Sequence, residues 1–270
     1  MLLFLFLQGL FKWRLNSFIS CFGIYSFMSF SNNNHSKSTY AWKTLHRIGG
    51  ATALAVLVLI PVQMVVFFLW PPPSSVIGWF TLFHENALVG LLDMDLLLIV
   101  DYLLLLGVFS ALWASLRRAE ESLMAIALIL QLVATATYLA STVAFEMLTL
   151  SNQYATATTE VERSIFLAAG QAMLVTWQGT AFDVSYVLSA LAILIVSAVM
   201  LRSHYLFSKT AGYAGLSAGV LALVPPTAGT IGVVFSLLSL VPMVVWLALI
   251  ARRLLRLGPL ERTSLPSKQS

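Results

Sequence analysis

Long apolar stretches alternate with short polar segments along most of the chain, and this alternation predicts transmembrane helices. A helix rises about 1.5 Å per residue, so about 20 apolar residues are needed to cross a hydrocarbon core of roughly 30 Å. Six stretches meet or approach that length, namely 48–70, 91–116, 122–145, 182–201, 211–226 and 229–251. The pattern therefore predicts an all-α fold, a polytopic membrane bundle of six transmembrane helices.

The basic residues lie at alternate ends of these stretches, and such residues concentrate in cytoplasmic loops. Lys37, Lys43 and Arg47 precede the first stretch, and Arg117 and Arg118 follow the second. Arg202 and Lys209 follow the fourth stretch, and Arg252, Arg253 and Arg256 follow the sixth. Only Arg163 falls on the other side. A count of five or seven spans breaks this alternation. We therefore expect a multi-pass protein of the cell membrane with both termini in the cytoplasm.

The chain divides by composition into an N-terminal extension (1–41), a six-span domain (42–257) and a polar cytoplasmic tail (258–270). The apolar run 1–11 is too short to span, and it precedes Lys12 and Arg14, the reverse of the order in a secretory signal peptide. Two interpretations stay open. The run lies upstream of a functional start at Met28, or it is an amphipathic anchor in the membrane interface.

Two segments between the expected spans are apolar without being assigned as spans. Prolines end the first span, and the following segment 74–86 places Trp79, Phe80 and Phe83 where an aromatic belt would lie at the outer interface. The segment 164–181 would reverse the charge alternation if it crossed the membrane. We expect it to be an outer interfacial or partly re-entrant helix.

Composition supports a membrane protein and argues against several other classes. Hydrophobic residues make up 59% of the chain and charged residues 10%, which is more apolar surface than a soluble protein of this length would bury. The basic residues form no stripe interleaved with aromatics, so no nucleic-acid partner is expected. Cys21 is the single cysteine, which excludes an internal disulfide. The sequence leaves both the cofactor and the oligomeric state unknown.

The fifth stretch is rich in small residues. Gly212, Gly215 and Gly219 recur at spacings that let helix backbones approach closely in lipid. The run Gly215-Leu-Ser217-Ala-Gly219 also matches the nucleophile-elbow pattern of serine hydrolases, but that motif needs a strand, a tight turn and a nearby His and acid. We interpret the run as a helix-packing surface.

One carboxylate falls inside an expected span and is the starting point for a candidate site. Asp101 lies about five residues, roughly 8 Å, into the apolar part of the second stretch. A carboxylate at the middle of a bilayer costs about 2.5 to 3.5 kcal/mol, so the side chain should face protein or water. Asp101 therefore needs a partner.

The third stretch offers a polar face for that partner, because Gln131, Thr135, Tyr138, Thr142 and Glu146 recur at helical spacing. Further polar groups are expected at the same outer level, namely Asp183, Gln171, Gln178 and His84. The predicted ligand-binding residues are Asp101, Glu146, Asp183, Tyr138, Gln178 and Gln171. Two interpretations stay open: a site for a cation, proton or polar solute, or polar contacts that set helix register.

The sequence contains no complete metal-binding or catalytic motif. His84-Glu85 has no second His four residues on, and the four His are dispersed. Asp93-Met-Asp95 lacks the further ligands and the glycine turn of a calcium loop. A metal site is therefore left unassigned, and an enzymatic activity is not favoured.

Three segments resemble the bacterial domain-of-unknown-function family 4386. They are the run from Gly90 to Asp101, the stretch from Ala144 to Tyr154, and the segment from Phe166 to Met173 together with Gln178 to Phe182. The resemblance covers about 42–257 and implies a multi-pass bundle. It implies no reaction.

Three functional hypotheses follow from the sequence. The first is a non-enzymatic membrane module that binds or moves a cation, proton or small polar solute through an outer acidic pocket. The alternatives are an intramembrane, metal-assisted lipid hydrolase and a structural or partner-binding membrane protein. Besides the lipid bilayer, the sequence identifies no partner.

Overall fold

The computed structural model describes residues 35–203 and 206–257, and this part of the chain is all helical. In chain order the elements are α3 (His35–Leu69), α4 (Val76–Glu85), α5 (Ala87–Leu91), the π-helical turn η1 (Leu92–Leu96), α6 (Leu97–Leu116), α7 (Glu121–Ser141), α8 (Ala144–Thr156), α9 (Glu160–Trp177), α10 (Thr180–Arg202), α11 (Lys209–Leu221), the 3-10 turn η2 (Pro226–Ala228) and α12 (Gly229–Leu257).

By its internal contacts the chain divides into two units, 1–41 and 42–270. The described helices belong to the second unit, apart from the start of α3. The predicted extension before residue 35 and the predicted tail 258–270 lie outside the described residues.

Five helical stretches of the described chain are long and apolar enough to cross a membrane. They are Trp42–Leu69, Ala87–Leu116, Glu121–Thr156, Glu160–Arg202 and Pro226–Leu257. These stretches contain or overlap five of the six expected spans, and they confirm an all-helical fold compatible with a membrane bundle. Two of them are longer than a bilayer requires, because α7 is followed closely by α8 and α9 by α10.

The remaining expected span, 211–226, differs from the prediction. Helix α11 has 13 residues, about 20 Å of helix, which is less than the roughly 30 Å of a hydrocarbon core. The chain leaves the helix at Ala222 and continues into η2. Pro225 and Pro226 explain the early end, since a residue before proline disfavours the helical conformation. The count of six helical spans is therefore not confirmed.

The glycine stripe on α11 packs against its neighbours, as the small-residue spacing predicted. A Cβ atom added to Gly219 would lie 3.2 Å from the backbone oxygen of Ala190 on α10. One added to Gly215 would collide with Ser197 of α10 and lie 2.5 Å from Nε1 of Trp246 on α12. Ser217 is exposed in the middle of a regular helix, so the sharp strand-to-helix turn of a nucleophile elbow is not formed.

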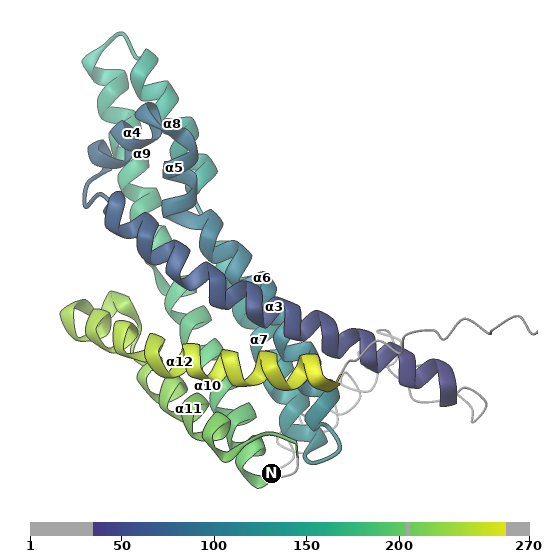
Figure 1. Cartoon of the computed structure of the whole chain (residues 1–270). Helices are drawn as coiled ribbons and strands as arrows, with labels where there is room; N and C mark the ends of the chain where they lie inside the picture. The colour runs from purple at the N-terminus through teal and green to yellow at the C-terminus, as the bar shows by residue number, and fades with distance from the viewer. Residues whose placement is uncertain (1–34, 204–205, 258–270) are drawn as a thin grey trace, which may run out of the picture. The chain divides into compact units, whose positions relative to one another are not determined.

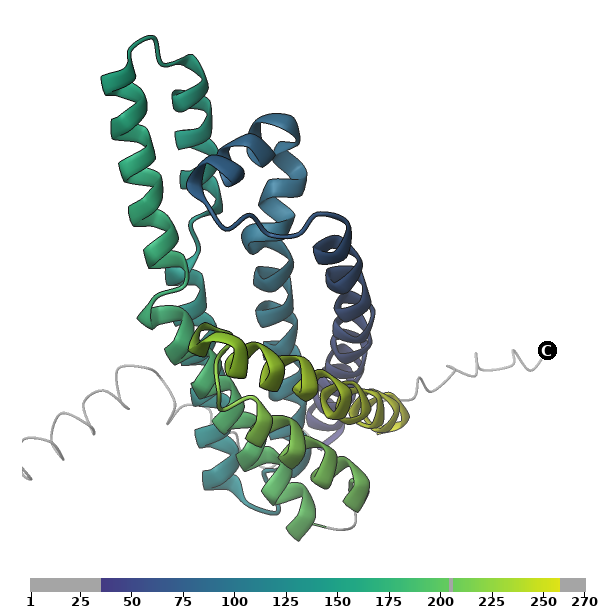
Figure 2. The same ribbon diagram turned by 90° about the vertical axis from the view of Figure 1, so that its left-hand side faces the viewer.

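Helices α4, α5, α8 and α9 form a second packed region beyond α6 and α7 (Figures 1 and 2). Its core contains Trp79, Phe80 and Phe83 together with residues of α8 and the π-helical turn. The prediction that these three aromatic rings form an interfacial belt is wrong, because all three are buried against protein. The aromatic rings instead hold α4 against α8 and α9, and the Trp79 ring meets Trp177 edge-on at 5.6 Å.

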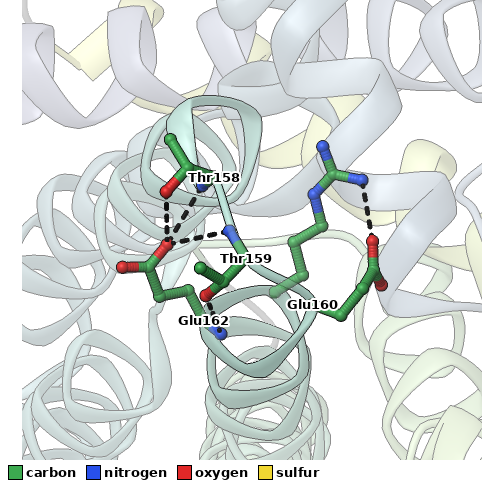
Figure 3. Close-up of polar contacts among 5 residues, drawn as sticks. Thr158, Thr159, Glu160 and Glu162 are labelled. Atoms are coloured by element: carbon green, nitrogen blue, oxygen red, sulfur yellow. Dashed lines mark hydrogen bonds and ion pairs between the residues drawn. The ribbon is translucent and has the colours of Figure 1, made fainter.

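The turn between α8 and α9 is closed by a capping box (Figure 3). The Glu162 carboxylate accepts hydrogen bonds from the backbone N–H groups of Thr158 and Thr159, at 3.0 and 3.2 Å, and its own N–H donates to the Thr159 hydroxyl at 3.2 Å. Arg163, one residue further, pairs with Glu160 at 3.4 Å. These contacts begin α9 at Glu160, ahead of the expected segment 164–181.

Basic residues from three parts of the sequence make contacts at the other end of the bundle. The Arg117 guanidinium stacks 4.1 Å from the Trp42 ring, joining the α6–α7 turn to α3. Arg202, at the end of α10, lies 3.8 Å from Glu120 beside the same turn. Arg253 of α12 donates a hydrogen bond of 2.6 Å to the carbonyl of Leu206 in the α10–α11 connection. We call this region the basic end.

Candidate functional site

The π-helical turn η1 lies between α5 and α6 and carries two buried acids. Asp93 is 3% exposed and Asp95 is 1% exposed. A π-helical turn widens the hydrogen-bond ladder by one residue, and such turns often occur at functional sites. Neither acid was among the predicted site residues. The signal that marks them is two carboxylates two residues apart inside an otherwise apolar stretch.

Asp95 is fully engaged by groups distant in sequence. Its Oδ2 accepts hydrogen bonds of 2.7 Å from each of the backbone N–H groups of Val143 and Ala144. Its Oδ1 accepts a hydrogen bond of 2.9 Å from the indole Nε1 of Trp177. The first two donors begin α8, where free N–H groups and the helix dipole favour an anion. Asp95 therefore acts as a cap supplied from another helix.

Asp93 has the opposite environment. Both of its carboxylate oxygens are buried, and neither has a hydrogen-bond partner in the described part of the chain. Burying a polar group without a partner costs about 1 to 3 kcal/mol, and a charged group costs more. The two acids of this turn therefore differ in their hydrogen bonding, because the oxygens of Asp95 accept hydrogen bonds and those of Asp93 have no donor among the described residues.

Asp101 directly precedes Tyr102 on α6, and its Oδ1 is also buried without a partner among the described residues. The Tyr102 ring stacks on Tyr138 of α7, with ring centroids 4.3 Å apart and planes 2° apart. Both Asp95 and Asp101 lie within electrostatic range of the Tyr138 hydroxyl. The Tyr102–Tyr138 stack therefore brings the part of α6 that carries Asp101 against α7.

Helix α10 completes the surroundings of the two tyrosines. The Tyr102 hydroxyl is hydrogen-bonded to Ser185 at 3.2 Å. One turn further along α10, Ser189 donates a hydrogen bond of 2.7 Å to Oε1 of Gln131 on α7. The Tyr138 hydroxyl and the Gln131 Nε2 are buried and lack partners within the ranges described. We call this set the interhelical polar cluster; its members are Asp101, Tyr102, Gln131, Tyr138, Ser185 and Ser189.

The remaining predicted site residues lie elsewhere. Glu146, Gln171 and Gln178 are exposed, and their side chains make no hydrogen bond to any other described residue. Asp183, at the beginning of α10, accepts a hydrogen bond from the Thr227 hydroxyl of η2. His84 is exposed on α4. Of the six predicted ligand-binding residues, Asp101 and Tyr138 are the two that belong to the cluster.

A break between α7 and α8 explains why Glu146 does not lie on the polar face that was predicted for it together with Gln131 and Tyr138. Thr142 adopts an extended conformation with φ −69° and ψ 138°, so α7 ends at Ser141 and α8 begins at Ala144. Helical spacing counted across this break does not place residues on one face. Gln131, Thr135 and Tyr138 lie before it and are buried together on α7, whereas Glu146 follows the new direction of α8.

The cluster offers hydrogen-bonding atoms without offering a metal cage. No three His, Cys, Asp or Glu of the described residues lie close enough together to hold a metal ion. The cluster's buried atoms without partners among the described residues are Oδ1 of Asp101, the hydroxyl of Tyr138 and Nε2 of Gln131. The Asp101 and Tyr138 oxygens suit a proton, a monovalent cation or a hydrogen-bond donor, whereas the Gln131 N–H₂ donates and needs an acceptor such as the oxygen of water or of a small polar molecule.

Comparison with protein-family models, with curated proteins and with solved structures finds no match to this chain. The resemblance to the domain-of-unknown-function family 4386 therefore stays a prediction, and the site stands on its geometry.

Proposed function

We propose that this protein is a multi-pass membrane protein that binds a proton, a monovalent cation or a small donor-rich polar solute at the interhelical polar cluster. The observation that carries the proposal is the set of buried polar atoms without partners around Asp101, Tyr138 and Gln131 in the described part of the chain. Each such atom costs roughly 1 to 3 kcal/mol if it stays without a hydrogen bond. A ligand that satisfies the Asp101 carboxylate and the Tyr138 hydroxyl would recover part of that cost.

The proposal includes six crossings of the cell membrane with both termini in the cytoplasm. Helix α11 starts shortly after Arg202 at the basic end, and the non-helical residues after Leu221 lead to Thr227, which bonds Asp183 at the first turn of α10. Helix α11 and this connection together would then return the chain to the level at which α10 begins. The meeting of basic residues from three parts of the sequence at one end supports a cytoplasmic basic end.

The hydrolase alternative gains no support from the site. Ser217 is exposed on a regular helix, and the described acids and His form no three-ligand metal site. The structural alternative suits Asp95, whose oxygens accept three hydrogen bonds. It does not account for Asp93 and Asp101, because residues kept only for stability would be expected to find partners.

The test is a thermal-shift titration of the purified full chain in detergent against Na⁺, K⁺ and NH₄⁺ at constant ionic strength. Asp101→Asn removes the charge at the cluster with little change in volume. Glu146→Gln is the matched control, because it removes an exposed carboxylate. We expect one cation to raise the unfolding temperature of the wild type and of Glu146→Gln, with the rise lost in Asp101→Asn.

A second measurement tests the proton as the ligand, because the cation titration does not detect proton movement. Vesicles containing the protein and a trapped pH-sensitive dye are given a potassium diffusion potential, and proton entry is followed. If neither proton movement nor a cation-specific shift depends on Asp101, the proposal fails, and the cluster would be a purely structural contact.

A further inference from the structure

The Arg117 side chain, at the basic end, lies close to two tryptophan rings. Its guanidinium lies 4.1 Å from the Trp42 ring centroid and 5.2 Å from the Trp113 ring centroid. The two rings belong to α3 and α6, and their centroids lie 6.0 Å apart with the planes at 51°. Stacking of this kind orients the guanidinium plane while leaving its N–H edges available.

Those N–H edges are not used by the protein. In the ranges that the structure describes, the Arg117 side chain makes neither a hydrogen bond nor an ion pair. The nearest acid in sequence, Glu120, lies 3.8 Å from Arg202 instead. The neighbouring Arg118 is exposed. An oriented guanidinium with five donors and no carboxylate is suited to bind a planar or tetrahedral anion through two parallel hydrogen bonds.

The position of Arg117 identifies the source of the anion. It follows directly after the apolar stretch Ala87–Leu116, so it lies where a span meets the headgroup region. Tryptophan rings are typical of that region. Ile48, on the α3 turns beyond Trp42, is half exposed, and the outer side of α3 continues apolar through Leu54 and Val58. A headgroup at Arg117 would thus have its acyl chains beside an apolar helix face.

We propose that Arg117, oriented by Trp42 and Trp113, binds the phosphate of an anionic phospholipid at the basic end of the bundle. The phosphate accepts two hydrogen bonds from the guanidinium, and the net negative charge of the lipid complements the positive charge of Arg117, which pairs with no acid of the described residues. Basic sites between helices on the cytoplasmic side of membrane proteins recognise anionic headgroups on these grounds. The site is separate from the interhelical polar cluster and does not depend on it.

The experiment counts bound lipid on the full chain by native mass spectrometry, with phosphatidylglycerol and phosphatidylcholine of identical acyl chains. We expect one phosphatidylglycerol to bind at least about tenfold more tightly than phosphatidylcholine. Arg117→Gln should abolish this preference, and Arg117→Lys should weaken it several-fold, because lysine keeps the charge and loses the paired donors. Arg118→Gln is the matched control, since it removes the same charge one residue away.

Each alternative outcome overturns the proposal in a recognisable way. Equal weakening by Arg118→Gln and Arg117→Gln would mean general attraction by the basic end. Unchanged preference in folded Arg117→Lys and Arg117→Gln would place the lipid elsewhere. Inorganic phosphate is the last ligand to be tested. If inorganic phosphate binds the wild type as tightly as phosphatidylglycerol in the same mass spectrometry, and Arg117→Gln removes that binding, the site binds a free anion and not a lipid.

Discussion

Asp95 and Trp177 are joined by a hydrogen bond of 2.9 Å from the indole Nε1 to the carboxylate Oδ1, across 82 positions of sequence. The other carboxylate oxygen holds the first N–H groups of α8. One side chain therefore connects the π-helical turn, the beginning of α8 and the end of α9. Asp95 thus ties the region formed by α4, α5, α8 and α9 to the beginning of α6 through the π-helical turn.

Replacing Asp95 by asparagine should destabilise the protein by about 1.5 to 3 kcal/mol, the range for hydrogen bonds to a charged group. Asparagine has one carbonyl oxygen for three donors, and its N–H₂ would face another N–H group. Chemical unfolding in detergent measures the loss. Asp183→Asn, at a half-buried position with one bond to Thr227, is the control and should lose less than half as much.

Replacing Asp93 by asparagine should have the opposite sign. Both Asp93 oxygens are buried without partners among the described residues, so removing the charge relieves a desolvation cost. We expect unfolding at a higher temperature than the wild type in the same assay. A loss of stability as large as that of Asp95→Asn would contradict this expectation, because it would mean that Asp93 is satisfied by a bound group.

Replacing Trp177 by phenylalanine separates the hydrogen bond from the aromatic packing. The variant keeps a ring beside Trp79, which meets Trp177 edge-on at 5.6 Å, but loses the donor to Asp95. We expect a loss of about 1 to 3 kcal/mol, the cost of removing one partner of a buried acceptor. Trp70→Phe, at an exposed position next to the prolines, should change the unfolding free energy by less than about 0.5 kcal/mol.

Replacing Gly215 by alanine tests the packing of α11. The added methyl group would collide with Ser197 and Trp246, two buried side chains on different helices. Overpacking of this kind costs about 1 to 3 kcal/mol. Ser217→Ala changes an exposed residue of the same helix and should be neutral for stability. Folded yield and unfolding temperature of the two variants are the measurements, and equal behaviour would contradict the close approach of α11 to α10 and α12.

The sequence by itself determined the helical class and the approximate position of five long apolar helices. It could do so because apolar content over about 20 residues is a local property that needs no knowledge of neighbours. The small-residue stripe Gly212, Gly215 and Gly219 was likewise readable, since its spacing on one helix is enough to indicate close packing.

Only the tertiary structure decided which polar residues meet. The break at Thr142 separates Glu146 from Tyr138, and no periodic pattern in the sequence marks it. The buried state of Trp79, Phe80 and Phe83 depends on α8 and α9 covering them. Asp95 is satisfied and Asp93 is not, although they are two residues apart, because the donors to Asp95 come from residues about 50 to 80 positions away. Hydrogen bonds join groups through space, and a linear pattern of residue types does not encode which distant donors a fold brings within about 3 Å.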